Sequence, residues 1–466
     1  MKKGKYERVT ESNKIKWLPL IIIIICASLV IVGCTMHNDS SDKSIEPTIS
    51  NDIELPNEDV IEIEDTIPEP TPEPEPEPII YKATIGAMGD LLMHSPIFNG
   101  IIKQEDGSYD FESIFQYIDD NITKLDYAVI NLETTLCGTD NGYTYSGYPN
   151  FNCPDSIVDG AKNAGFDMLL TANNHSYDTK LVGYKRTIET VRNAGLETLG
   201  TYVLPDETKW TVVNVNDINI GMLCYTYAFS VTEDGRPSLN GNPAIAENNL
   251  CNYFDYNNLD KFYAEVEAHI AAMEDAGAEA TMMYIHWGNE YQLVENETQR
   301  KIAQKLCDLG IDVIVGGHPH VVQPMDLLQS TIDENHKTIC IYSVGNAVSN
   351  QRLGAISYVN TAHTEDGVLF TVTFERIDDG EVTVTDVEVV PTWVYLHSKN
   401  GAKEYNIIPL SWYQFEFWQD MFDLDDNAFQ KAQDSYYRTM DIVEEGLTEI
   451  KEYCNKNAES IINTEN

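Results

Sequence analysis

The sequence predicts an α/β fold in which helices cover a sheet that contains parallel strands. From residue 81 onward, short apolar runs typical of buried strands alternate with longer stretches of helical periodicity. Several of the helical stretches end at a glycine, which commonly closes a helix. Polar residues follow directly after the apolar runs, where open α/β sheets place their chemistry. Alternation at this spacing favours parallel strands with covering helices.

The expected elements follow one another in a regular order. We expect strands at residues 82–88, 126–130, 168–171, 281–285 and 313–315, and a hairpin of 210–215 and 218–225 around Asn216-Asp217. We expect helices at residues 111–122, 156–164, 181–194, 259–276 and 299–309. Residues 337–343, 368–376 and 382–390 are expected to be strands of a second sheet.

The composition limits the classes of function. The chain has 466 residues, of which 42% are hydrophobic, enough for one large α/β domain with appendages. Its formal net charge is −45, from 75 acidic against 30 basic residues. That charge disfavours nucleic acids and anionic membrane surfaces as partners, because both are polyanions. The nine cysteines include no CxxC motif, although a pair such as Cys137 and Cys153 could join outside the cytoplasm.

Residues 1–33 have the pattern of a secretory signal. Lysine and arginine residues in 1–16 precede an almost wholly apolar run at 17–32. Gly33-Cys34 ends the run and resembles the lipobox of bacterial lipoproteins, in which the cysteine is acylated and becomes the first mature residue. The run is short for a spanning helix, but an uncleaved single N-terminal membrane anchor is the alternative. Either interpretation tethers the chain to the extracytoplasmic face of the cell membrane.

Residues 34–79 show no pattern that could build a core. The segment is acidic and ends in alternating proline and glutamate from 68 to 78. Such alternation favours an extended polyproline II conformation, stiffened by charge repulsion. We interpret the segment as a disordered tether that holds a folded domain away from the membrane. A disordered interaction tail is the alternative.

Side chains capable of binding metal follow five of the expected strands. They are, in chain order, Asp90, Glu133, Asn174 with His175, His286, and His318 with His320. In the last of these loops, Gly316-Gly317 allows a sharp turn and Pro319 fixes the backbone between the two histidines. Carboxylates, an amide oxygen and imidazoles together suit clustered divalent metals. The alternative is that the histidines belong to ordinary polar loops.

Six motifs occur in the order typical of a known family. They are Gly89-Asp90, Asn131-Leu132-Glu133, Ala172-Asn173-Asn174-His175, His286-Trp287-Gly288-Asn289-Glu290-Tyr291, Gly317-His318-Pro319-His320 and Tyr342-Ser343-Val344-Gly345-Asn346. On these motifs, residues 81–350 resemble the CapA family of poly-γ-glutamate capsule biosynthesis proteins, which are similar to calcineurin-like metallophosphoesterases. The resemblance implies a four-layer α/β/β/α sandwich of the metallophosphoesterase type, with a dimetal site at the loop ends between the sheets.

The resemblance also implies a role for each of these residues. The implied ligands are Asp90, Glu133 and His320 for a first ion, and Glu133, Asn174, His286 and His318 for a second. Glu133 would bridge the two ions, where phosphoesterases normally have aspartate. His175 takes the place of the catalytic histidine that protonates a leaving oxygen. The implied cofactor is one or two divalent ions, with Mn, Zn or Fe as candidates.

One position departs from the phosphoesterase pattern. That pattern opens with Asp-x-His, whereas Leu92 stands two residues after Asp90. The first ion therefore has one imidazole fewer, unless His94 takes that place. His94 could equally lie behind the ligands or on the surface.

The chain is expected to have four parts. They are a lipoprotein signal segment at 1–33, the acidic tether at 34–79, a metallophosphoesterase-like domain at 80–395 and a C-terminal helical extension at 396–466. Residues 411–455 of the extension have helical character and many aromatic side chains, so we expect them to cover the domain or to bind a partner.

Three functions are open from the sequence. The first is a metal-dependent hydrolase of a phosphoester or a related electrophile at the cell surface. The second, implied by the family, is a tethered component of poly-γ-glutamate synthesis or export, in which the metal could serve a scaffold. The third is a non-catalytic protein that binds a polyanion. The expected partners are a cell-surface phosphoester or polyglutamate-type polymer and a capsule synthesis complex at the membrane, with no nucleic acid.

Overall fold

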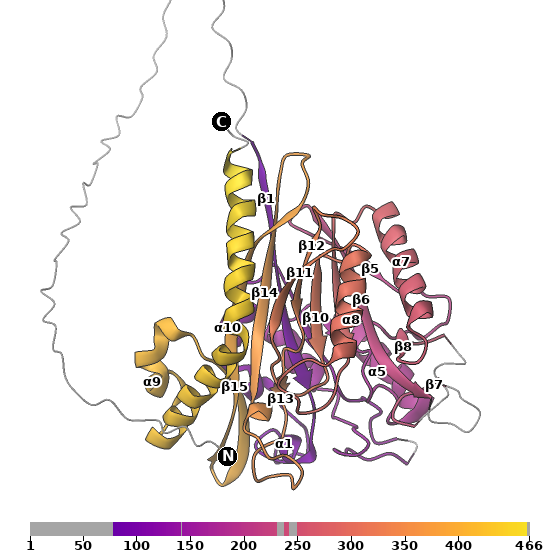
Figure 1. Ribbon diagram of the computed structural model, residues 1–466. Coiled ribbons are helices and arrows are strands. Elements are labelled where there is room, and N and C mark those ends of the chain that lie inside the picture. Colours follow the sequence, from indigo (N-terminus) through magenta and orange to yellow (C-terminus); the bar gives the residue numbers. More distant parts are fainter. Residues whose placement is uncertain (1–77, 141, 231–236, 242–248, 464–466) are drawn as a thin grey trace, which may run out of the picture. The chain divides into compact units, whose positions relative to one another are not determined.

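The structure is a computed structural model that describes residues 78–140, 142–230, 237–241 and 249–463 (Figure 1). The expected signal segment, Cys34 and the tether as far as residue 77 lie outside these residues. None of the helices in the described ranges combines the length and the apolarity that crossing a membrane requires.

The first sheet is built around its longest parallel strand, β1 (Ile80–Leu91). Within the described residues its order is β16 (Ala402–Pro409), β15 (Thr383–Lys399), β14 (Asp366–Ile377), β1, β2 (Tyr127–Asn131), β3 (Met168–Leu170) and β4 (Glu197–Leu199), with β13 (Asn346–Val348) also paired to β1. Strands β1 to β4 are parallel, whereas β14 to β16 are antiparallel. The segments 368–376 and 382–390 thus belong to this sheet and not to the second one. β14 pairs with β1 along the edge opposite β2 and so satisfies the backbone groups there, and β15 pairs with β14 in turn.

The second sheet repeats this mixed pattern. Its order within the described residues is β11 (Met325–Gln329), β12 (Lys337–Ile341), β10 (Val313–Gly317), β9 (Ala280–His286), β6 (Ile218–Ser230) and β5 (Thr211–Val215), with β7 (Pro237–Ser238) and β8 (Tyr253–Asp255) paired to β6. Strands β12, β10, β9 and β6 are parallel, and β11 and β5 are antiparallel strands at the edges.

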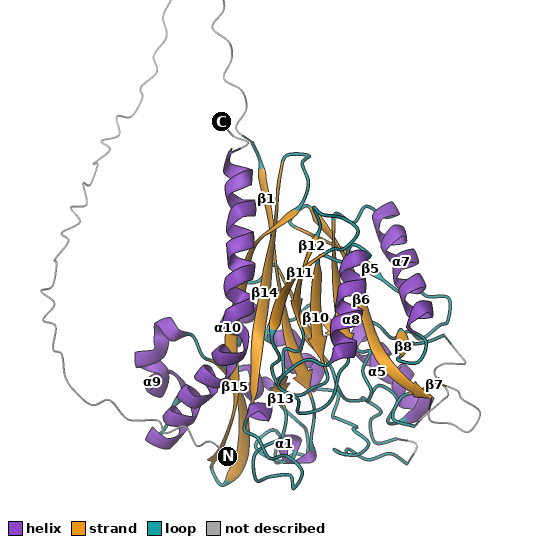
Figure 2. Cartoon of the chain, viewed as in Figure 1, coloured by secondary structure: helices purple, strands orange, loops and turns teal. Residues whose placement is uncertain are grey.

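The two sheets pack face to face, and helices cover their outer faces (Figure 2). The first sheet is covered by α1 (Ser95–Phe98), α2 (Glu112–Phe115), α3 (Asp119–Ile122) and α4 (Ile157–Asn163), and α5 (Lys180–Asn193) lies against β4. The second sheet is covered by α7 (Leu259–Asp275) and α8 (Glu297–Asp308). The expected helix at 111–122 is divided into α2 and α3. This arrangement confirms the four-layer α/β/β/α sandwich.

Packing on both faces explains why the strands are almost continuously apolar. In β10, Val313 and Val315 belong to the core between the sheets, whereas Ile314 packs in the core beneath α7 and α8. All three side chains are buried. A parallel strand covered on both faces has no solvent-facing side, so it shows no alternation of polar and apolar residues.

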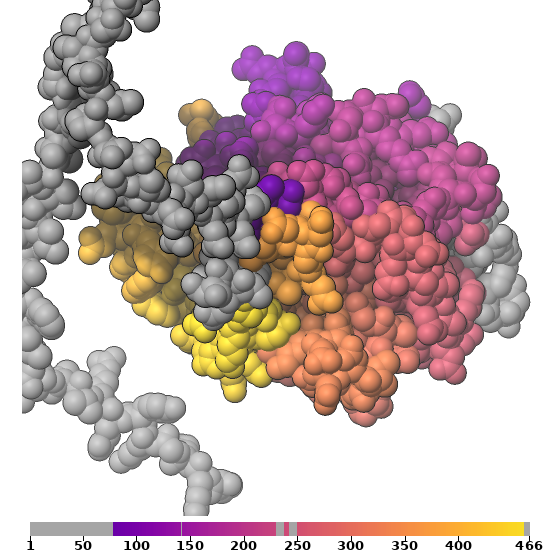
Figure 3. Space-filling model, turned by 90° about the horizontal axis from the view of Figure 1, so that it is seen from above, coloured from indigo at the N-terminus to yellow at the C-terminus, as the bar shows by residue number. Residues whose placement is uncertain are grey.

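The long helix α10 (Asp426–Asn463) packs on both sheets, against β15 and β11, and Figure 3 shows its yellow end bordering the orange part of the chain. Gly446 allows the close approach, because a Cβ atom there would lie 1.9 Å from the carbonyl oxygen of Met325. The region after residue 395 is not helical at first. β15 continues to Lys399 and β16 follows, so helical structure begins at the 3-10 helix Trp412–Phe417 and continues with α9 (Trp418–Phe422).

All seven cysteines among the described residues are buried free thiols. Cys137 and Cys153 are therefore not joined, although the sequence allowed that pairing. Burial raises the pKa of the Cys153 thiol well above its usual range, which keeps the thiol protonated. The described fold is held by packing and hydrogen bonds rather than by disulfide bonds.

Candidate metal centre

The side chains expected to bind metal meet where parallel strands of both sheets end. The first sheet contributes Asp90, Glu133 and Asn174, and the second contributes His286, His318 and His320. All six residues are buried, and none exposes more than 5% of its surface. The fold therefore turns six residues that are scattered along the chain into one cluster.

The loop after β10 has an unusual backbone. A Cβ atom at Gly316 would lie 2.0 Å from the carbonyl oxygen of Tyr342, so only glycine fits there. His318 (φ 95°) and His320 (φ 56°) both adopt positive φ angles, which L-residues other than glycine rarely do. Backbone of this kind is concentrated at ligand-binding and active sites.

The cluster consists of two groups of ligand atoms that share one carboxylate. Glu133, His286 and His318 form one group, and Asp90, Glu133 and His320 form the other. In each group the candidate ligand atoms lie within 4.8 Å of one another. Oε1 of Glu133 is 3.5 Å from Nε2 of His286, and Oε2 is 3.9 Å from Nδ1 of His320. Glu133 is thus the carboxylate that two ions would share.

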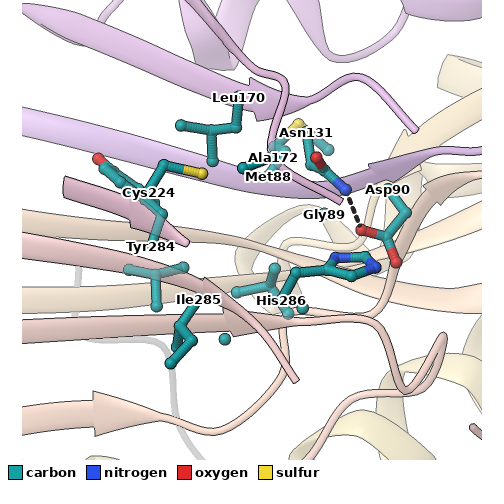
Figure 4. Close-up of a pocket in the computed structure, with 14 residues that line it drawn as sticks. Met88, Gly89, Asp90, Asn131, Leu170, Ala172, Cys224, Tyr284, Ile285 and His286 are labelled. Carbon is teal, nitrogen blue, oxygen red and sulfur yellow. Dashed lines mark hydrogen bonds between the residues drawn. The ribbon is translucent and has the colours of Figure 1, made fainter. Parts of the chain in front are cut away.

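Neighbouring side chains orient both groups. Oδ1 of Asn174 lies 2.9 Å from Nε2 of His286, which adds an amide oxygen to the group of Glu133, His286 and His318. In the group that contains Asp90, Nδ1 of His320 lies 3.0 Å from Oδ2 of Asp90. Asn131 donates a 2.7 Å hydrogen bond from Nδ2 to Oδ1 of Asp90, and Figure 4 shows this pair beside His286.

Burial keeps two imidazoles of this cluster, those of His286 and His318, in the form that binds metal. It lowers the pKa of His286 to about 3 and lowers the pKa of His318 well below its usual range, with the neighbouring histidine adding to the effect on His318. At His320, burial is outweighed by the hydrogen bond and the charge of Asp90, which raise the pKa of that imidazole. A neutral imidazole has a lone pair free for a cation, whereas an imidazolium has none.

Glu133 provides the test of whether a cation fits. Its side chain is fully buried, and neither carboxylate oxygen has a hydrogen-bond partner among the described residues. Burial, and next the charge of Asp90, raise the pKa of Glu133 well above its usual range. Nδ1 of His318 also lacks a partner. Buried polar atoms without partners are costly, and a divalent cation between them would satisfy them. The donor set therefore fits a divalent metal site.

His175 lies beside the metal groups but belongs to neither of them. Its Nδ1 donates a 2.8 Å hydrogen bond to Oδ2 of Asp178, which also accepts the backbone N–H of Phe151 at 2.7 Å. The Phe151 ring packs edge-on against the imidazole, with 4.6 Å between the ring centroids. The carboxylate fixes the ring orientation and leaves Nε2 as the atom that can exchange a proton.

His175 also lines an open cleft of about 250 Å³ beside the metal groups. The other lining residues are Leu92, His94, Tyr148, Phe151, Glu290, Tyr291, His320, Gln351 and Tyr358. This cleft gives the cluster a route to solvent, so a ligand could reach both His320 and His175.

His94 does not join either group of metal ligands. Its Nδ1 lies 3.2 Å from the carbonyl oxygen of Leu92 and accepts the backbone N–H of Asn350 at 3.3 Å. Burial lowers its pKa to about 4. The imidazole that Leu92 lacks is therefore not supplied by His94 in this arrangement.

Three functional neighbours were not identified from the sequence. Asp178 stands three residues after His175, a spacing that could have suggested the pair. Asn131 orients Asp90 but precedes Glu133 in a motif that drew attention only to the carboxylate. Asn346, the last residue of the sixth motif, is buried and has Oδ1 3.1 Å from Nδ1 of His320. The motif marked Asn346 as a residue of interest, but its contact with His320, 26 residues away, depends on the fold.

The fold and the buried donor set define an α/β sandwich protein with a site suited to divalent metal. The chain belongs to the family described as bacterial capsule synthesis protein PGA_cap, whose family model matches residues 84–351. That range includes all six candidate ligands and His175.

Two curated relatives carry capsule-related names. "PGA biosynthesis protein CapA" of Bacillus subtilis (strain 168) is 25% identical over 325 residues, which are 69% of this chain and 75% of the relative. "Capsule biosynthesis protein CapA" of Bacillus anthracis is 27% identical over 277 residues, 58% of this chain and 60% of the relative. Among solved structures, the calcineurin-like phosphoesterase YfkN from Bacillus subtilis aligns with 76% of this chain and 100% of its own, at a TM-score of 0.39 and 14% identity.

Proposed function

We propose that the chain is a membrane-tethered, metal-dependent hydrolase that cleaves phosphoesters during the synthesis or export of a capsule polymer. The observation that carries the proposal is the 2.8 Å contact between His175 and Asp178 beside the two metal groups. A scaffold that only binds metal needs no histidine held by a buried carboxylate at the wall of an open cleft. A general acid needs that arrangement.

The residues divide between holding metal and moving a proton. Glu133 with Asp90 and His320, and Glu133 with Asn174, His286 and His318, would hold the ions. Ions of the Mn, Zn or Fe type, which such nitrogen and oxygen donors favour, would stabilise negative charge on the phosphoryl group.

His175 would give its proton to the leaving oxygen, while Asp178 holds the ring in place and stabilises its charged form. The P–O bond to the leaving alcohol breaks, and water supplies the oxygen of the new P–O bond. Overall, one proton of that water replaces the proton that His175 gives to the alcohol, so the enzyme returns to its starting state.

The sequence supports the cellular setting of this proposal. Basic residues before an apolar run, followed by Gly33-Cys34, favour a lipid anchor through Cys34 at the extracytoplasmic face. A single N-terminal membrane anchor remains the alternative. The names of the two relatives support work on a capsule polymer. A capsule synthesis complex at the membrane is the partner that this setting would require.

One observation favours a scaffold as the second candidate. Leu92 stands where phosphoesterases have an imidazole, and His94 is engaged with backbone groups instead of with Asp90. The group of Asp90, Glu133 and His320 therefore has one nitrogen ligand fewer. A metal bound there could serve structure or the binding of polymer carboxylates.

Activity of His175→Ala separates the two candidates. The full-length protein is loaded with Mn²⁺ or Zn²⁺ and assayed on an alkyl and an aryl phosphoester, with His336→Ala outside the cleft as control. We expect His175→Ala to keep its metal. Its rate of hydrolysis of the alkyl ester should fall about 10²–10⁴-fold. The loss should be smaller for the aryl ester, whose leaving group is already a stable anion. If the loaded wild type cleaves neither ester and His175→Ala supports normal amounts of polymer in cells, the scaffold is correct.

A further inference from the structure

The cleft next to the metal groups carries information about the substrate. His175, the proposed general acid, forms part of its wall, together with His320 from the metal cluster. A general acid must lie within hydrogen-bond reach of the leaving oxygen. On the proposed function, the alcohol released from phosphorus must therefore lie in this cleft, and the lining residues determine which alcohols fit.

Aromatic rings form much of the cleft wall. Phe151 and Tyr291 lie deeper, whereas Tyr148 and Tyr358 are 66% and 50% exposed. Solvent-exposed tyrosines at the edge of a cleft are well suited to recognition, because they offer a large rigid surface with a polar tip. The rings of Tyr291 and Tyr358 are inclined by 39° with centroids 6.2 Å apart, so they do not form the parallel slot that a flat nucleobase would need.

The charge of the cleft disfavours a ligand that carries acidic groups. Among its described lining residues none is lysine or arginine, and Glu290 is exposed there. The chain as a whole carries −45 formal charges. A glutamate polymer would meet carboxylate repulsion from Glu290, and no lysine or arginine lines the described cleft to offset it. A ligand with hydroxyl groups would instead donate hydrogen bonds to Glu290.

We propose that this cleft binds carbohydrate and that the substrate is a phosphoester whose leaving alcohol is a neutral sugar. A sugar ring presents C–H groups on its faces, which pack on the negative faces of aromatic rings, and hydroxyl groups on its rim, which suit a carboxylate. This assignment rests on the proposed function for the reaction, but the binding of sugar to the cleft can be measured without turnover.

Binding is measured first, with the full-length protein without added metal. Saturation-transfer NMR is recorded with maltotriose as the neutral oligosaccharide and with poly-γ-glutamate as the anionic polymer. We expect transfer to maltotriose and its loss in Tyr148→Ala and Tyr358→Ala. Tyr413→Ala is the matched control, because Tyr413 is 96% exposed and does not line the cleft.

Turnover is measured next, on three phosphate esters of primary alcohols: methyl glucopyranoside 6-phosphate, hexyl phosphate and 3-phosphoglycerate. We expect kcat/KM to be highest for the sugar ester and lowest for the acidic one. Each tyrosine-to-alanine change should lower kcat/KM for the sugar ester about three- to tenfold, the scale of one lost aromatic contact, and should leave hexyl phosphate less affected.

The outcomes distinguish this assignment from the proposed function. If no ester is cleaved but maltotriose binding depends on Tyr148 and Tyr358, the hydrolase fails and the sugar site stands. If esters are cleaved without preference for the sugar and both tyrosine variants bind maltotriose as the wild type does, the sugar site is overturned and the hydrolase stands. Displacement of maltotriose by poly-γ-glutamate from the cleft would also overturn it.

Discussion

Nδ1 of His175 lies 2.8 Å from Oδ2 of Asp178, and both side chains are almost fully buried, with His175 in the wall of the cleft. The same carboxylate oxygen accepts the backbone N–H of Phe151, whose ring packs against the imidazole. Asp178 thus fixes the position of the loop before it and the orientation of the ring at once. The pair makes His175 a positioned group rather than a mobile surface histidine.

Asp178→Asn should preserve this geometry while removing the charge. We expect kcat to fall about 10–100-fold, the scale reported for carboxylates that support functional histidines. KM and metal content should stay unchanged, because Asp178 belongs to neither metal group. Steady-state kinetics with elemental analysis tests this, and Asp155→Asn, which changes an exposed ion pair, is the control. A parallel loss of metal would show that Asp178 supports the cluster instead.

Glu133→Gln should weaken the metal-loaded protein and leave the metal-free protein nearly unchanged. Glutamine is a poor bridge between cations, so both groups should lose metal. Metal-free stability should change little, because burial and next the charge of Asp90 disfavour the charged form of Glu133 and raise its pKa well above its usual range. We expect the metal-dependent rise in Tm to shrink, since a ligand stabilises in proportion to its affinity for the folded state. Thermal unfolding with and without chelator measures both quantities. A variant that keeps full metal content would rule out the shared carboxylate.

Arg438→Met should uncouple α10 from the first sheet. Arg438 donates two hydrogen bonds to Asp366, at 2.8 Å and 2.7 Å, and Ser435 donates a third. Removing the guanidinium leaves a buried carboxylate without its cation, which typically costs about 3–5 kcal/mol of unfolding free energy. Urea denaturation of the full chain measures this, with Lys451→Met on the exposed face of α10 as control. A cost equal to that of Lys451→Met would contradict a structural role for this pair.

The same pair predicts a pH dependence. Burial raises the pKa of Asp366 to about 6, above the ordinary 3.8, and Arg438 and Ser435 oppose the rise. The folded chain therefore binds this proton more tightly than the unfolded chain does. Its contribution to stability is present below the unfolded pKa and is lost as pH rises through the folded one. We expect Arg438→Met to be more destabilising at about pH 7 than at about pH 5, because the unpaired charge forms only at the higher pH. Equal costs at both pH values would contradict this assignment.

Cys34→Ala tests the tether, which lies outside the described residues. If Cys34 is acylated, the variant should accumulate as an unprocessed precursor without lipid. Metabolic labelling with a fatty acid, followed by fractionation of the membrane, measures this outcome. Cys26→Ala, within the apolar run, is the control. Absence of label from the wild-type chain would favour the uncleaved anchor.

Local sequence patterns predicted the parallel half of the fold well, because buried strands and glycine-closed helices are local features. The run 313–315 predicted β10 within two residues, and the run 126–130 predicted β2 within one. Patterns could not show which sheet 368–376 joins, because the partner of that strand is β1, nearly 300 residues earlier in the chain. They also placed the end of the domain at residue 395, which is too early. β16 lies beyond that residue, and its place in the sheet is set by its antiparallel pairing with β15.

The candidate site, like the fold, was predictable where it depends on local sequence and not where it depends on distant contacts. The position of each candidate ligand after a strand was visible in the sequence, and the six side chains lie together in the fold, although their binding of metal stays a prediction. The contacts of His94 could not be predicted, because they depend on the path of the backbone at Leu92 and Asn350. The role of Asn346 depends on β13 pairing with β1, a contact across the whole domain.

The separation of the ligands along the chain has a consequence for how the protein would acquire its ion. Asp90 and His320 are 230 positions apart, and no short segment contains more than two of the six donors. An unfolded chain therefore offers no local chelating sequence, and the site appears only when both sheets have assembled. For a chain that crosses the membrane unfolded, the ion would be selected where folding finishes. Metal availability outside the cell, rather than in the cytoplasm, would then decide which element the protein carries.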